Sequence, residues 1–194
     1  SNRIFSISEF SLTFTSTGFF VFLILNGIAM ILYPGTTHLD QSSIGYSFTH
    51  NFFSDLGRTV TYSGDPNFLS STCFILSVMV VGLGLTTYFT TSWRYFVDGK
   101  ISKNLSRIGS VIGVISGISF VGISLTPDNL FHEWHIFFVH WGFRTFLAVM
   151  IIYGFAIVTN KNGIPKNLAY YYLGFAMVCA GYVALLIWGP SIYS

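Results

Sequence analysis

Histidines and carboxylates are the side chains of this chain whose types and spacing could do chemistry. The densest group of them spans residues 132–144, where three of the five histidines accompany Glu133 and Arg144. At 100° per residue, Glu133, His140 and Arg144 lie within about 60° of one another on a helix, so they form one polar stripe. The five histidines of the chain are His38, His50, His132, His135 and His140.

Two kinds of reactive centre fit these residue types. A zinc site needs neutral imidazoles and a carboxylate, and the candidates are His50, His132, His135 and Asp55. The spacing of His132 and His135 allows such a site, which leaves zinc open as a cofactor, although the metalloprotease pattern His-Glu-x-x-His is absent. A hydrolytic site would pair a serine with a histidine and an acid; its catalytic candidates are Ser54, Asp55 and His135.

Two further interpretations of the histidines remain. They could lie at a membrane interface and hydrogen-bond loops and lipid headgroups, or they could sense protons or a ligand. Haem ligation would need two histidines facing each other at matching depth on different helices. Only His140 lies clearly inside an apolar stretch, which argues against haem.

The elements that must position these residues are five long apolar stretches. About 20 apolar residues cross the ~30 Å hydrocarbon layer as a helix, and each stretch reaches that length. Hydrophobic residues make up 52% of the chain, charged residues 8%, and the mean hydropathy is +0.65. The sequence therefore predicts an all-α bundle and one integral membrane domain over residues 1–194. The expected spans are 10–33, 66–93, 108–127, 134–160 and 167–188, with a long loop at 35–64.

The basic residues predict the orientation of this bundle. Cytoplasmic loops of membrane proteins carry an excess of lysine and arginine, and seven of the nine basic residues fall on one side of the expected spans. The amino terminus is therefore expected in the cytoplasm and the carboxyl terminus outside, where the long loop and most carboxylates also lie. Because the basic residues stand at span ends and not in one patch, the net charge of +2 does not indicate nucleic acid as a partner. The seven are Arg3, Arg94, Lys100, Lys103, Arg107, Lys161 and Lys166.

Local signals predict further details of the helices. Asp65 and Pro66 fit the N-cap and first position of the second span. Glycines at 109, 113 and 117 let a neighbouring helix approach closely, which places the third span in the middle of the bundle. The mixed aromatic and polar segment 48–57 is expected to form a short helix at the membrane interface.

Arg144 is the basic residue expected to need a partner most. It lies deep in the fourth span, where an unpaired cation costs at least ~2.5 kcal/mol. We expect its guanidinium to reach towards Asp55 or Glu133, with His140 beside the contact. Arg58, in the long loop, is expected to matter little.

Two segments resemble a known family. Segment 51–57 (NFFSDLG) and segment 122–128 (GISLTPD), the latter followed by His132 or His135, are similar to the Ile-Ser-[Asp/Glu]-Leu-Gly and Gly-x-Phe-Pro-x-Asp…His stretches of a bacterial and archaeal family of multi-span membrane proteins. The family usually has six spans and has no assigned function. The pattern is also similar to the DRAM-type autophagy-modulator and GPI-lipid-remodelling membrane proteins.

The resemblance implies association with lipid and a place in the plasma membrane of a prokaryote. It also singles out six positions that should converge on the outer face: Ser54, Asp55, Gly57, Pro127, Asp128 and His135.

Three functions follow as expectations. The favoured one is a membrane protein that binds a lipid or other amphiphile in an outward-facing polar cavity. The first alternative is a metal-assisted or Ser/His hydrolase acting on lipid at the outer interface. The second is a non-catalytic accessory subunit, whose partners would be other membrane subunits as well as lipids. The expected ligand-binding residues are Asp55, Glu133, His135, His140 and Arg144.

Overall fold

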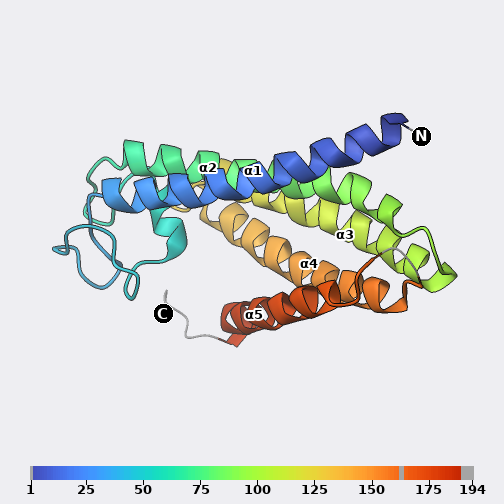
Figure 1. The fold of residues 1–194 in the computed structure, drawn as a ribbon. Coiled ribbons are helices and arrows are strands. Elements are labelled where there is room, and N and C mark those ends of the chain that lie inside the picture. Colours follow the sequence, from blue (N-terminus) through green and yellow to red (C-terminus); the bar gives the residue numbers. More distant parts are fainter. Residues whose placement is uncertain (1, 162–163, 189–194) are drawn as a thin grey trace. The chain divides into compact units, whose positions relative to one another are not determined.

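The structure, a computed structural model, is all-helical over residues 2–161 and 164–188, which are the residues it describes. Five of its α-helices are long and apolar enough to cross a membrane, as the sequence predicts, and no strand occurs among the described residues. The protein is thus an integral membrane protein. In chain order (Figure 1) the elements are α1 (Asn2–Leu32), η1 (Phe53–Gly57), α2 (Phe68–Thr91), η2 (Ser92–Tyr95), α3 (Lys100–Leu125), α4 (His132–Thr159) and α5 (Leu168–Trp188).

The helix ends differ from the expected spans where polar residues continue a helix past its apolar part. Helix α3 begins at Lys100, eight residues before the expected start. The basic segment 100–107 is helical, but it is too polar to be recognised from the sequence as part of an apolar stretch. Helix α2 begins at Phe68, so Asn67 and not Asp65 precedes it. The predicted cap at Asp65 is therefore wrong: this carboxylate accepts a hydrogen bond from Ser63 instead. The short helix expected within 48–57 is present as η1.

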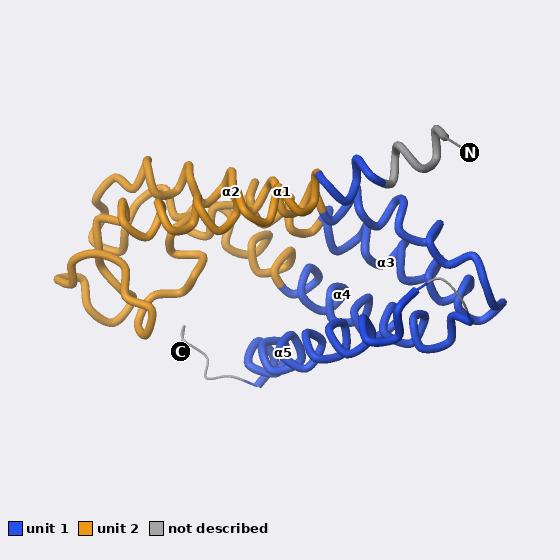
Figure 2. The backbone as a smooth tube through the Cα atoms, viewed as in Figure 1, with its two compact units in different colours: residues 1–13, 85–118, 140–194 blue, residues 14–84, 119–139 orange. Residues whose placement is uncertain are grey.

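The chain divides into two compact units (Figure 2). Unit 1 comprises residues 1–13, 85–118 and 140–194, and unit 2 comprises residues 14–84 and 119–139. Unit 1 thus contains α5 and most of α3 and α4. Unit 2 contains the long loop between α1 and α2 and the connection between α3 and α4.

The core of unit 1 surrounds one tyrosine. Tyr153 on α4 is 1% exposed, and its ring packs against Phe89 and Phe96. Its hydroxyl lies 2.6 Å from the Ser92 hydroxyl and 2.8 Å from the Ser110 hydroxyl. Small hydroxyl residues that hydrogen-bond across membrane helices let backbones approach while satisfying buried polar atoms.

Helix α3 is the most buried of the five spans, since half of the residues in its most apolar segment are buried inside the protein. Two glycines explain the close packing. A Cβ atom at Gly109 would lie 2.7 Å from the Tyr153 ring, and one at Gly113 would overlap the ring of Phe89. The predicted close-approach role is therefore confirmed for these two glycines.

Gly113→Ala should destabilise the protein, because the buried Phe89 ring cannot move away from the new methyl group. Overpacking of this kind costs about 1–3 kcal/mol. The matched control is Gly174→Ala on α5, where a Cβ atom meets nothing within 4 Å and where alanine favours the helix. Thermal unfolding in detergent, followed by circular dichroism, should show a lower Tm for the first variant only. Equal Tm values for both variants would contradict the packing described here.

Candidate functional site

Asp55 organises the long loop of unit 2. Its carboxylate is 2% exposed and accepts three hydrogen bonds, each 2.9 Å long, from the Asn51 amide, the Phe52 backbone N–H and the Tyr62 hydroxyl. The Asn51 amide also donates to the Thr36 carbonyl. Burial raises the pKa of Asp55 above its ordinary value of 3.8, although these hydrogen bonds and the nearby Arg58 act in the opposite direction.

An ion pair joins this loop to the connection between α3 and α4. The Nη1 atom of Arg58 donates to Oδ2 of Asp128 at 2.8 Å, and the two side chains are only 14% and 10% exposed. The other carboxylate oxygen, Oδ1, lies 2.8 Å from Nδ1 of His132. The Arg58 guanidinium also lies over the Tyr62 ring, 4.1 Å from its centre. We call Asp55, Arg58, Tyr62, Asp128 and His132 together the polar cap.

A second pair of contacts runs beside the ion pair. The Thr59 backbone N–H donates to Oδ1 of Asn129 at 2.9 Å, and the Asn129 amide donates back to the Thr59 hydroxyl at 2.8 Å. The consecutive residues 58 and 59 are therefore paired with the consecutive residues 128 and 129. This arrangement fixes the register of the loop against the α3–α4 connection.

His135 has one satisfied and one unsatisfied ring nitrogen. Its Nδ1 lies 2.7 Å from the Thr126 carbonyl oxygen. A carbonyl only accepts, so the proton must be on Nδ1. The ring is 3% exposed, and Nε2 has no hydrogen-bond partner among the described residues. A buried acceptor left without a donor costs about 1–3 kcal/mol.

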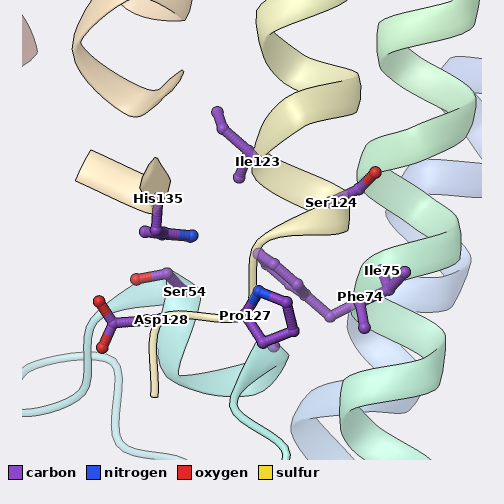
Figure 3. A pocket seen from close by; sticks show the side chains of 9 residues that line it. Ser54, Phe74, Ile75, Ile123, Ser124, Pro127, Asp128 and His135 are labelled. Carbon is purple, nitrogen blue, oxygen red and sulfur yellow. The ribbon is translucent and has the colours of Figure 1, made fainter. Parts of the chain in front are cut away.

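A hollow in unit 2 brings His135 together with two other candidate residues. Figure 3 shows Ser54 from η1, Asp128 from the α3–α4 connection and His135 from α4 around this hollow. Apolar side chains close it so tightly that no water molecule fits. The full lining is Ser54, Gly57, Phe74, Ile75, Ile123, Ser124, Pro127, Asp128 and His135.

The four candidate zinc ligands are not brought together. His50 lies 2.8 Å from the Thr49 hydroxyl, and Asp55, His132 and His135 each have the separate partners given above. Across residues 2–161 and 164–188, no three His, Cys, Asp or Glu side chains are grouped so that they could hold a metal ion.

The remaining candidates divide between the two units. Glu133 belongs to unit 2, whereas His140 and Arg144 belong to unit 1, so their expected convergence on one cavity with Asp55 stays a prediction. The Glu133 and Arg144 side chains are exposed.

Arg58, in contrast, was underestimated from the sequence. It makes an ion pair with the nearly buried Asp128, whereas the sequence analysis expects Arg58 to matter little.

Sequence reasoning also missed Tyr62 and Asn129. For Arg58 a signal exists, since it is the only basic residue in a loop region rich in carboxylates and directly follows the Asp-Leu-Gly segment 55–57. For Tyr62 and Asn129 the sequence offers no comparable signal, because their roles depend on which loops meet.

Comparison of the chain with protein-family models, with curated proteins and with solved structures finds no match. The resemblance drawn from segments 51–57 and 122–128 therefore stays a prediction. Of the six positions it singles out, all except Asp55 line the hollow at His135, namely Ser54, Gly57, Pro127, Asp128 and His135.

Breaking the ion pair from either side should destabilise the protein. Arg58→Met and Asp128→Leu each leave a nearly buried charge without its partner, which should cost about 2 kcal/mol or more. The double variant should lose less than the sum of the two, because it removes both charges. Asp65→Asn, at an exposed position of the same loop, is the control. Strictly additive losses of Tm in detergent would show that the pair does not interact.

Asp55 should make stability depend on pH. Its pKa is raised in the folded protein, so the folded state holds this proton more tightly than the unfolded state. Stability is then highest below the ordinary pKa and falls as the pH rises through the raised one. Asp55→Asn should flatten the fall of Tm that begins as the pH rises above 3.8, the ordinary pKa of an aspartate. The Tm difference between wild type and variant would instead be constant with pH if burial of this carboxylate carried no cost.

Proposed function

We propose that this protein binds the headgroup of a lipid or another amphiphile at the polar cap of unit 2. The proposal rests on the side chains that surround His132. Its side chain is 46% exposed while it is joined to the buried Asp128. The neighbouring Leu130, Phe131 and Trp134 are exposed apolar side chains. Aromatic residues of this kind sit at the headgroup level of a bilayer, so a polar headgroup can reach His132 while its chains contact the apolar neighbours.

The tautomer of His132 indicates which headgroups fit. Because the Asp128 carboxylate only accepts, Nδ1 of His132 carries a proton. In the uncharged form of this ring, Nε2 is then the nitrogen that accepts a hydrogen bond. The same holds for Nε2 of His135. The half-exposed His132 therefore favours a headgroup that donates N–H or O–H, such as ethanolamine or glycerol, over the quaternary ammonium of choline, which has no such donor.

Lipid retention tests this proposal. Protein reconstituted in nanodiscs with phosphatidylethanolamine or phosphatidylcholine should retain the first lipid in native mass spectrometry and lose the second. His132→Phe keeps an aromatic ring but removes the acceptor, and it should weaken retention about tenfold, or ~1.4 kcal/mol. Gln41→Ala, at an exposed position of the same unit outside the polar cap, is the control and should behave as wild type. Equal retention of the two lipids by wild-type protein would contradict the proposal.

One observation favours a lipid hydrolase as the second candidate. Ser54 and His135 line the same hollow, and Nε2 of His135 has no partner there among the described residues. In such a hydrolase, Nε2 would take the Ser54 proton while Oγ attacks an ester carbonyl. The ester C–O bond would then break, and Nε2 would give the proton to the departing alcohol. Water would later cleave the acyl–Ser54 ester and release the fatty acid. The Thr126 carbonyl would hold the imidazole in the required tautomer. The hollow has no room for that water, which makes binding the better-supported function.

Labelling with a fluorophosphonate probe separates the two functions. A hydrolase would be labelled at Ser54, and the label would be lost in Ser54→Ala and in His135→Ala. A binding protein would remain unlabelled, and Ser54→Ala would retain phosphatidylethanolamine as well as wild type does.

A further inference from the structure

A second polar hollow lies in unit 1, where α2 ends and α3 begins. Its volume is about 220 Å³, and none of the residues proposed above to bind lipid takes part in it. Three cations and three aromatic or aliphatic side chains line it: Trp93, Arg94, Phe96, Val97, Lys103 and Arg107.

The local fold explains how these residues come together. Helix α2 passes into η2, whose Ser92 is anchored to the Tyr153 hydroxyl. Phe96 then inserts into the core of unit 1. Gly99, at a positive φ of 80°, turns the chain into α3. Lys103 and Arg107 follow one turn apart on that helix, so their side chains emerge on the same face.

An indole ring holds two of the cations at the hollow. The guanidinium groups of Arg94 and Arg107 lie 5.6 Å and 5.5 Å from the centre of the Trp93 ring. The Trp93 N–H donates to the Thr90 carbonyl at 3.2 Å, which fixes the ring. Cation–π contacts of this kind orient a guanidinium without neutralising it.

The positive charge of this hollow is not balanced by acids of the protein. Among the described residues, both ion pairs are made by Asp128, and neither includes Arg94, Lys103 or Arg107. Asp98 is the only acid in residues 92–107, and it makes no ion pair with them. Like charges around one hollow repel each other, so an anion bound there would relieve that repulsion.

The surroundings of the hollow place it at a membrane surface. Helices α2 and α3 are both long and apolar enough to span a membrane, and the hollow lies where one ends and the other begins. Val97, Ile101 and Ile108 are exposed apolar side chains beside the cations. The charge bias of the sequence predicts that this end faces the cytoplasm, where anionic lipids attract lysine and arginine.

We propose that this hollow binds the phosphate of an anionic phospholipid headgroup. Guanidinium groups match phosphate oxygens with paired hydrogen bonds, and Lys103 adds a third cation. The exposed apolar side chains beside the hollow would contact the acyl chains. Phosphate is the chemistry that is recognised, and it could also come from free phosphate, which lacks those chains.

Binding of phosphatidylglycerol, phosphatidylethanolamine and inorganic phosphate tests the proposal and its lipid source. Both lipids have a headgroup that can donate a hydrogen bond at the polar cap, but only phosphatidylglycerol is anionic. Wild-type protein in detergent should bind phosphatidylglycerol at least about tenfold more tightly than phosphatidylethanolamine, as measured by native mass spectrometry. The double variant Arg94→Gln/Arg107→Gln should lose this preference. Lys100→Gln removes one charge from the same helix without touching the hollow and should keep it. Inorganic phosphate should compete only weakly.

Each other outcome overturns part of the proposal. No preference for phosphatidylglycerol in wild type, or an equal loss in Lys100→Gln, would show that the hollow is not a specific site. Competition by inorganic phosphate as strong as that by the lipid would assign the hollow to free phosphate. Lys103→Gln separates loss of binding from loss of folding, because Lys103 is exposed. This variant should weaken binding while leaving the Tm unchanged.

Discussion

Buried carboxylates impose the main constraint on this structure, because each is stable only where donors surround it. Asp55 meets the constraint with donors from its own loop. Asp128 meets it with Arg58 and His132, which come from two different segments. The loop between α1 and α2 is therefore joined to the start of α4 by charged groups. Tyr62 links the two carboxylates, since its hydroxyl binds Asp55 and its ring lies under Arg58.

The same constraint has a different solution in unit 1. Its core buries several hydroxyl groups, such as those of Ser92, Ser110 and Tyr153. Hydroxyls can donate and accept, so they satisfy one another without any charge. Charges in unit 1 collect instead at the end of the helices, around Trp93. Unit 2 thus buries the charged groups of Asp55, Arg58 and Asp128 within loops. Unit 1 places those of Arg94 and Arg107 where a membrane surface is expected.

The sequence predicted the helices better than their ends or their polar contacts. Span length and hydropathy are local properties, and all five helices were found from them. The start of α3 at Lys100 was missed because hydropathy reports only the part of a helix that is apolar. The partner of Asp128 was missed because Arg58 is 70 residues away in the chain, and no local pattern says which loops meet. Ser54 and His135 were both candidates, yet only the fold shows that they share a hollow.

The functional account depends on the half-exposed His132, whose ring reaches a lipid headgroup while its Nδ1 stays bonded to Asp128. The most direct test is ¹⁵N NMR of protein labelled at histidine, in nanodiscs at neutral pH. Single substitutions assign the signals of His132 and His135. The account predicts a proton on Nδ1 of both rings, and a change in the His132 Nε2 signal when phosphatidylethanolamine replaces phosphatidylcholine. An unprotonated Nδ1 in either ring, or a His132 signal that does not respond to the lipid, would contradict it.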